Sequence, residues 1–369
     1  MNDKYKIIDT RLSESFKTIT FSGYKKTDVY KILFKSIESG KIENACNWAT
    51  ECICSGYINE LWQKLIIYSC TSISINNPTL YNYLYKKNVY FINIINNIDK
   101  KDRYSNLNLR NNQIIRNLFF SIITILTMSS KTKRYDKYPK LKDNDFVFDN
   151  IFKRFKALAN IIPGDLIHLN EPEELKLVSN EIFTYFKNKN YENSLYWTIW
   201  FFEWEKRNIK AKNNWYIESR DIDVDNKFKN DSVWIIWKCI LLESEYKTNN
   251  IKLQIKSLYE LYKNDYTSRK KSKRMPLIYT AICFLTNDIN WNVSLINNNS
   301  IYIQTNINNN KMFGIKKIHE NKNIIKDIEI DKKSFPENKV INRMVSEKCI
   351  DKLKIFDELD PIMNSKNEF

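Results

Sequence analysis

The small number of glycines is the feature that most restricts the fold of this chain. Of 369 residues, only 5 are glycine and 7 are proline. Tight β-turns and phosphate-cradling loops need glycine, because glycine adopts positive φ freely and lets the backbone approach closely. An all-β sandwich is therefore disfavoured, and we expect an all-α protein with long helices and polar connections.

The apolar content is sufficient for a large folded core. Hydrophobic residues make up 43% of the chain and aromatic residues 14%, which argues against general disorder. The longest apolar stretch, Leu118–Met128, is shorter than the ~20 residues that a membrane-spanning helix requires. We therefore expect a central buried helix there and no membrane span. Residues 1–12 lack the apolar run of a secretion signal.

Two apolar helices, broken at Gly56, are predicted within Ile42–Ile66. Short loops force consecutive helices to lie side by side in antiparallel fashion. The chain is thus predicted to be a helical hairpin array. A fainter copy of this stretch follows later, since Glu192–Trp197 aligns with Glu43–Trp48. Either the helical unit is duplicated, giving two related halves, or two similar helices match by chance.

Changes in composition along the chain predict five regions. These are an extended lead-in (1–25), an N-terminal helical half (26–128), a basic linker (129–145), a second helical half (146–287), and an Asn/Lys-rich C-terminal region with one or two peripheral helices (288–369).

Several kinds of chemistry find no support in the motifs. The sequence contains no G-x-x-x-x-G-K-[ST] and no G-x-G-x-x-G phosphate-binding motif. Its two histidines, His168 and His319, are far apart and have no evident partner. Three acids within apolar helices, Glu51, Glu203 and Glu205, show no recognisable catalytic spacing, so we expect them to be exposed or paired with lysine. We predict no catalytic residue and no cofactor.

The cysteines also fail to predict a metal site. All seven are expected to be reduced, because their number is odd and disulfide scaffolds are small. On a helix, Cys46 and Cys52 would lie about 240° apart and Cys52 and Cys54 about 200° apart. Zinc needs convergent ligands. Buried thiols are therefore the better interpretation.

Tryptophans recur at helical spacing in two stretches. One contains Trp197, Trp200 and Trp204, and the other contains Trp234 and Trp237. Each ring buries about 150–250 Å², so packing of two helices in a core is the first interpretation. An exposed stripe that stacks on bases or binds a partner is the second.

The charge balance favours polyanionic partners. The net charge is +16, which attracts nucleic acid at long range, although an AT-rich genome with Lys-rich codons would produce the same excess. Two basic stretches supply the candidate polyanion-binding residues: Lys131, Lys133, Arg134, Arg269, Lys270, Lys271, Lys273 and Arg274. Solvated loops are the alternative interpretation.

The chain resembles a family of uncharacterised helical proteins encoded by nucleocytoplasmic large DNA viruses. The resemblance covers roughly residues 9–287. It is carried by D-T-R-L-S-E-S-F (9–16), T-F-S-G-Y-K-K-T-D-V (20–29), A-C-N-W-A-T-E-C-I-C-S-G (45–56), Y-W-T-I-W-F-F-E-W-E (196–205) and W-I-I-W (234–237). It implies a viral protein of the host cytoplasm (the viral factory) or the virion, with the nucleus as another location, and no established activity.

A weaker similarity covers Ser36–Leu84, where A-x-x-W precedes a helix that ends at glycine and a later N-P. This stretch is similar to the helical C-terminal region of replication ATPases related to clamp loaders. It implies at most a collar-like oligomerisation fold, because the ATPase part has no counterpart here.

Together these patterns predict a non-catalytic viral interaction or scaffold protein that acts through protein–protein surfaces, with viral or host proteins as partners. The alternative is a basic accessory factor that binds nucleic acid in viral DNA replication or transcription. The oligomeric state does not follow from the sequence.

We predict that Trp48→Ala lowers the free energy of unfolding by about 3–5 kcal/mol, because a large buried ring is replaced by a methyl group. Chemical denaturation followed by circular dichroism measures this loss. An unchanged unfolding midpoint would mean that the indole is exposed.

Overall fold

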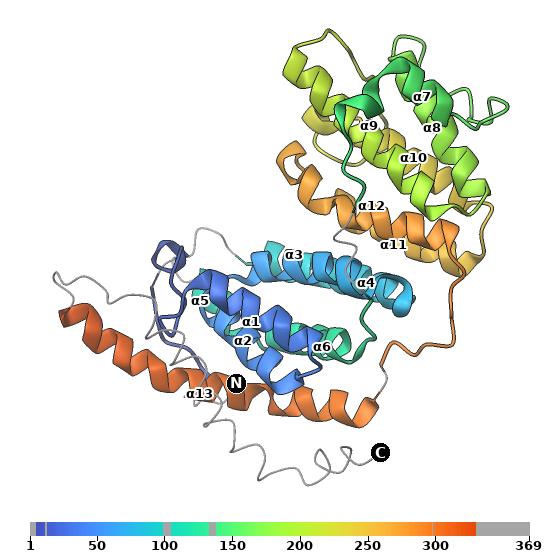
Figure 1. Cartoon of the computed structure of the whole chain (residues 1–369). Coiled ribbons are helices and arrows are strands. Elements are labelled where there is room, and N and C mark those ends of the chain that lie inside the picture. The colour runs from blue at the N-terminus through green and yellow to red at the C-terminus, as the bar shows by residue number, and fades with distance from the viewer. Residues whose placement is uncertain (1–4, 12, 99–104, 133–137, 297, 330–369) are drawn as a thin grey trace.

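The computed structural model describes residues 5–11, 13–98, 105–132, 138–296 and 298–329. Within these ranges the regular secondary structure is helical, apart from one isolated antiparallel bridge between Ile19 and Lys25. The predicted all-α fold is therefore confirmed, and Figure 1 shows it as two groups of helices.

The first group follows the lead-in. It comprises α1 (Lys26–Glu38), α2 (Ile42–Cys54), α3 (Ile58–Tyr68), α4 (Leu80–Asn96), α5 (Ser105–Asn111) and α6 (Gln113–Met128). Helix α6 is buried along most of its length and packs against α1 and α2, as its uniformly apolar sequence predicted. No helix of the described residues has the combination of length and apolarity needed to cross a membrane.

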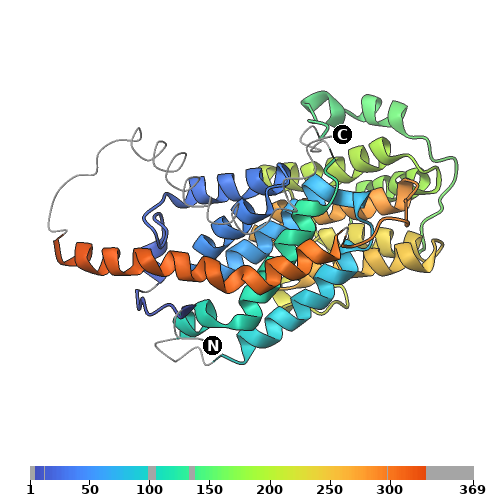
Figure 2. The same ribbon diagram turned by 90° about the horizontal axis from the view of Figure 1, so that it is seen from below.

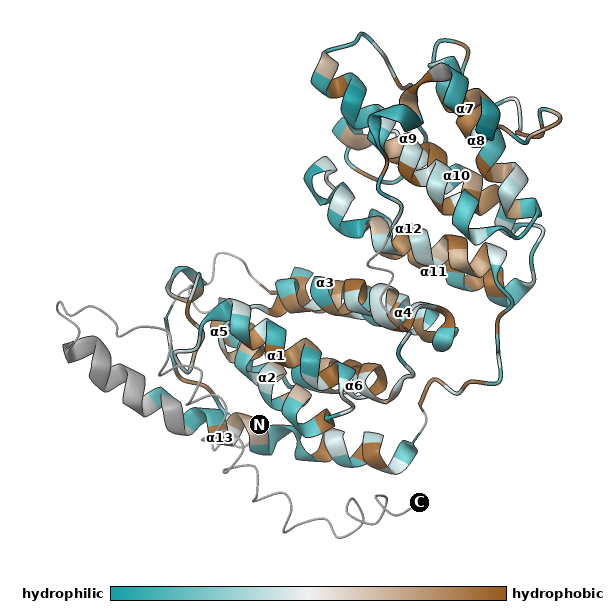
Figure 3. Cartoon of the chain, viewed as in Figure 1, coloured by the Kyte–Doolittle hydropathy of each residue, from teal (hydrophilic) through white to brown (hydrophobic). Residues whose placement is uncertain are grey.

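The second group comprises α7 (Phe148–Arg154), α8 (Glu173–Lys187), α9 (Tyr191–Ala211), α10 (Val233–Ser244), α11 (Asn249–Lys263) and α12 (Lys271–Thr286). The basic linker lies between α6 and α7. In both groups, hydrophobic and hydrophilic residues alternate around the helices, as packing of amphipathic helices requires (Figure 3).

Helices α11 and α12 join the two groups by packing against α3 and α4 (Figure 1). The rings of Tyr81 and Phe284 meet edge to face, with their centroids 5.7 Å apart. The backbone N–H of Asn82 donates to the Gln254 side chain at 2.9 Å. The buried apolar residues form one cluster that extends through both groups.

The α1–α2 and α8–α9 hairpins turn in the same way. Gly40 and Lys189 both have positive φ, at 74° and 50°. One residue later, the N–H of Lys41 donates to the carbonyl of Ser36, and that of Asn190 to the carbonyl of Tyr185, both at 2.9 Å. This is the hydrogen-bond pattern that ends many helices at a left-handed residue.

Most of the tryptophans belong to the core. Trp48 is 4% exposed, and Trp197, Trp200, Trp234 and Trp237 are 2% exposed or less. Trp204 is partly buried and packs edge to face on Trp215. The core interpretation of the tryptophan stripe is thus confirmed.

Helix α13 (Asn299–Glu329) returns to the first group and runs alongside α2 and α6 (Figure 2). The sequence predicted a peripheral helix in this region. One side of the helix buries Met312, Phe313, Lys316 and Glu320, each less than 5% exposed. The sequence did not identify these four residues as buried, because two of them are charged and the surrounding sequence is rich in asparagine and lysine.

The lead-in is held against the first group by buried polar side chains. Asn111 exchanges two hydrogen bonds of 2.8 Å with the backbone of Ile7. Arg110 donates to the carbonyl of Asp9 at 2.9 Å, and burial lowers the pKa of this guanidinium. From α13, Glu320 accepts the N–H of Ile8 at 2.7 Å. The extended backbone thus finds partners for its polar groups within the protein.

Glu51 of α2 connects three segments of the chain. Lys316 of α13 pairs with it at 2.9 Å, and both side chains are less than 5% exposed. The N–H and hydroxyl of Ser22, in the lead-in, each donate to its carboxylate at 2.7 Å. The sequence predicted an exposed or lysine-paired acid here, without identifying this lysine.

We predict that Glu51→Gln and Lys316→Met each lower the free energy of unfolding by about 3–5 kcal/mol, because each leaves an uncompensated buried charge or polar group. The double variant Glu51→Leu/Lys316→Met should lose less than the sum of the two. Urea denaturation measures all three. Glu60→Gln is the matched control. The Glu60 side chain also pairs with lysines but is 40% exposed, so this substitution should cost at most about 1 kcal/mol of unfolding free energy. Full additivity would show that the pair contributes no coupling.

The same pair predicts a dependence of stability on pH. Burial by itself raises the pKa of Glu51, but Lys316 and hydrogen bonds from Thr20 and Ser22 bring it below its usual value of 4.5. The folded pKa is thus below the unfolded one, so the stabilisation is complete above the unfolded pKa and is lost as the pH falls through the folded pKa. In acid titrations of the unfolding midpoint, Glu51→Gln should therefore show a shallower loss below about pH 4.5. Parallel curves for the two proteins would contradict this.

Candidate functional site

The structure separates the eight basic residues that the sequence grouped as polyanion-binding candidates. Arg269 and Lys273 are exposed, and Lys270 pairs with Asp265 at the surface. Lys271 and Arg274 instead point inward. Lys131 donates to the carbonyl of Thr127 at 2.9 Å. Lys133 and Arg134 lie outside the described residues.

Arg274 is part of the buried interior. It is 3% exposed and donates to the backbone carbonyl of Tyr262. Its burial lowers the pKa of the guanidinium, as burial also lowers the pKa of Lys131, to about 8. Both residues donate hydrogen bonds to backbone carbonyls within the protein. They are unsuited to the polyanion contact that the sequence predicted.

Lys271 lies at the centre of a partly buried ion cluster. Its ammonium donates to Glu205 of α9, to Asp231 at 2.6 Å and to the hydroxyl of Ser232 at 3.0 Å. The Ser232 hydroxyl in turn donates to Glu205 at 2.7 Å. Tyr266 donates its hydroxyl to Asp231, also at 2.7 Å. The side chains of Lys271, Glu205 and Asp231 are 13%, 11% and 8% exposed.

The local sequence explains why these residues meet. Lys271 opens α12, where the helix dipole disfavours a cation. Glu205 projects from α9, which packs against α12, and Asp231 precedes α10. Two acids thus compensate a lysine placed at an unfavourable helix end. Asp231 and Ser232 were not identified from the sequence, where they read only as the start of an apolar helix.

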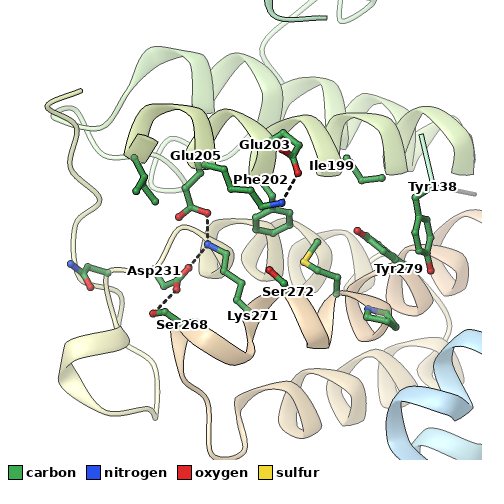
Figure 4. Close-up of a pocket in the computed structure, with 15 residues that line it drawn as sticks. Tyr138, Ile199, Phe202, Glu203, Glu205, Asp231, Ser268, Lys271, Ser272 and Tyr279 are labelled. Carbon is green, nitrogen blue, oxygen red and sulfur yellow. Dashed lines mark hydrogen bonds and ion pairs between the residues drawn. The ribbon is translucent and has the colours of Figure 1, made fainter. Parts of the chain in front are cut away.

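A cavity of about 620 Å³ opens beside this cluster (Figure 4). Its walls come from α9, from α12 and from the linker, which contributes Tyr138. The rings of Tyr138 and Tyr279 have centroids 4.3 Å apart. The cavity combines apolar and charged side chains: Tyr138, Ile199, Phe202, Glu203, Glu205, Lys206, Ile209, Asn230, Asp231, Ser268, Lys271, Ser272, Met275, Pro276 and Tyr279.

A smaller cavity, of about 400 Å³, surrounds His168. The Nδ1 atom of this histidine lies 3.2 Å from the carboxylate of Glu218, a partner that the sequence did not suggest. Behind it, Arg220 and Glu171 form a buried ion pair at 2.7 Å. The arrangement holds the loop before α8 in place. His319 lies in α13, and its side chain is outside the described set.

The cysteines follow the sequence interpretation. Cys46, Cys52 and Cys54 are fully buried, and burial raises the pKa of each thiol. In the part of the chain that the structure describes, no three His, Cys, Asp or Glu residues come together as a metal site. Cys349 is outside that part.

Glu203 and Glu205 both lie at the larger cavity and both pair with lysine. Glu203 pairs with Lys206 at the rim, and Glu205 pairs with Lys271 deeper inside. The cavity with its ion cluster can bind a ligand through apolar contact and carboxylate hydrogen bonds. It is the candidate site.

Removing Lys271 should destabilise the fold. We predict that Lys271→Met costs about 3–5 kcal/mol of unfolding free energy, because two carboxylates remain together without their cation. Lys273→Met is the matched control, since this exposed lysine lies two residues further along α12 and should change stability by at most about 0.5 kcal/mol. Urea denaturation of both variants checks the difference. Equal stability would mean that the cluster is not structurally important.

Comparison with known proteins provides no relative for this site. No family model, no curated protein and no solved structure matches the chain. The resemblance to proteins of large DNA viruses stays a prediction from the sequence.

Proposed function

We propose that the chain is a non-catalytic interaction or scaffold protein that binds viral or host proteins through its surface. The observation that carries the proposal is the cavity of about 620 Å³ beside Lys271. Its volume lies within the ~300–1,000 Å³ typical of binding pockets, and its apolar walls with a few polar groups are the usual composition of such sites.

The state of Lys271 further supports binding over catalysis. A catalytic lysine acts as a nucleophile or base, which requires a free amine. The Lys271 side chain instead donates hydrogen bonds to three acceptors within the protein, two of them carboxylates, so that none of its three donors is left for a substrate. In this proposal the cluster shapes and charges the cavity.

The proposal extends to the architecture and the setting. The matching turns of the α1–α2 and α8–α9 hairpins, each followed by a buried tryptophan, support two related halves. With the viral resemblance, the protein would work in the host cytoplasm or in the virion. Repeated helical hairpins suit a scaffold because each unit presents an outer surface.

The alternative is a basic accessory factor that binds nucleic acid. The net charge of +16 favours it, together with the exposed positions of Arg269 and Lys273. The internal hydrogen bonds of Lys131, Lys271 and Arg274 count against it. A nucleic-acid surface would have to use basic residues other than these three.

The two functions are separated by one double variant, Arg269→Ala/Lys273→Ala, which removes the exposed charges without touching the ion cluster. A scaffold should retain its protein partners in this variant. Cross-linking and affinity purification from virus-infected cells, followed by reconstitution of the purified pair, measure retention. A protein that stays monomeric and forms no reconstituted pair would contradict the scaffold proposal.

Nucleic-acid binding is measured in parallel by fluorescence anisotropy with a short DNA duplex and a single-stranded RNA. The scaffold proposal expects no binding at physiological salt, about 150 mM. Binding that falls steeply with salt and is lost in the double variant would support the alternative. Each phosphate contact that the variant removes should lower the slope of log K against log salt concentration by about one unit.

A further inference from the structure

We propose that the cavity beside Lys271 receives a lysine or arginine side chain of a partner protein. The inference rests on the proposed interaction function and specifies the chemistry of the partner. It follows from the charge balance of the cavity, from the acceptors that remain on its carboxylates and from its apolar walls.

The charge balance of the cavity is negative, although the protein carries +16. Glu205 and Asp231 face a single cation, Lys271. At the rim, Glu203 and Lys206 neutralise each other. Among the described residues that line the cavity, one negative charge therefore remains without a counter-ion, in a partly buried place where screening by solvent is weak.

An anion would find no donor in the cluster. An ammonium has three N–H groups, and those of Lys271 are directed to Glu205, Asp231 and Ser232. A phosphate or a carboxylate ligand could bind only by breaking one of these bonds beside two like charges. The ion cluster is thus unfavourable for an anion.

A cation finds an acceptor in Glu205. A carboxylate accepts up to about four hydrogen bonds. Asp231 already accepts from Lys271 and the N–H of Val233 at one oxygen, and from Tyr266 and Ser268 at the other. Among the described residues, Glu205 accepts one hydrogen bond at each oxygen, from Ser232 and from Lys271. About half of its acceptor capacity is open to a ligand.

The walls select a cation on an apolar stem. Ile199, Phe202, Met275 and Tyr279 line the cavity and give it apolar and aromatic surface. The Lys271 ammonium already lies 5.2 Å from the centre of the Phe202 ring, which shows that this aromatic face accommodates positive charge. An inorganic cation has no apolar part to bury against these walls. A lysine or arginine side chain fills them with its methylene groups and places its charge at Glu205.

The volume suits a side chain that arrives with its backbone. About 620 Å³ exceeds what one side chain occupies and leaves space for the flanking residues of an extended segment. A charge-complementary segment of a partner protein therefore uses the whole cavity, whereas a free amine would leave much of it to water.

The test is isothermal titration calorimetry of the full chain, which measures the dissociation constants of three blocked pentapeptides. The peptides differ only in the central residue, which is arginine, norleucine or glutamate. The arginine peptide should bind at least about tenfold more tightly than the norleucine peptide, because a charge-assisted hydrogen bond contributes that factor or more. The glutamate peptide should not bind. Equal binding of the arginine and norleucine peptides, or no binding of any peptide, would overturn the proposal.

Three variants test whether the arginine peptide binds in this cavity. Glu205→Gln should weaken binding of the arginine peptide about tenfold or more. The matched rim variant Glu203→Gln should weaken it by less than about twofold, since Glu203 is only partly buried and already pairs with Lys206. Ile199→Trp fills the cavity without touching the ion cluster and should abolish binding even if Glu205→Gln fails to fold. Unchanged binding in Ile199→Trp would overturn the assignment to this cavity.

Two further measurements distinguish a peptide ligand from a small amine, and a failure of the cavity inference from a failure of the proposed function. Free arginine amide should bind more weakly than the peptide; equal affinity would identify a small amine as the ligand and overturn the partner segment. If reconstituted partner complexes persist in Ile199→Trp, the cavity inference fails while the scaffold function stands. If no complex forms at all, the proposed function itself fails.

Discussion

The ion pair between Glu51 and Lys316 is the interaction on which the arrangement of the chain depends. It joins α2, near the beginning of the chain, to α13, which follows every other described helix. Both charges are buried, so neither is tolerable without the other. The pair therefore specifies where α13 lies, because a different register of this helix would leave two unpaired charges in the interior.

Several other buried polar groups follow from this placement. Once α13 lies along α2 and α6, Glu320 accepts a hydrogen bond from the backbone N–H of Ile8. The Cζ atom of Arg116 lies over the Phe313 ring, 3.7 Å from the ring centroid. The lead-in then has partners on both sides, from α13 and from the α5–α6 corner. An Asn-rich helix is thus held by specific polar contacts together with the buried side chains of Met312 and Phe313.

The second group of helices uses a different balance of charges. In the Lys271 cluster, two acids compensate one lysine, and the cluster borders an open cavity rather than the closed core. A closed site would not tolerate the excess acid, because an uncompensated charge in a low-dielectric interior costs several kcal/mol. At the edge of a cavity, solvent or a basic ligand can balance it. This difference separates a structural ion pair from a candidate binding site within one chain.

The amino-acid sequence by itself determined the helical class, the central place of α6, the buried tryptophans and the buried thiols, because each depends on local periodicity and on composition. The tertiary structure alone decided what the charged residues do. Arg274 and Lys271 read as part of a basic surface run, yet one binds a backbone carbonyl and the other pairs with acids some forty and sixty-six residues away in the chain. Charge pairing acts through space, and no local pattern states which distant carboxylate a lysine will meet.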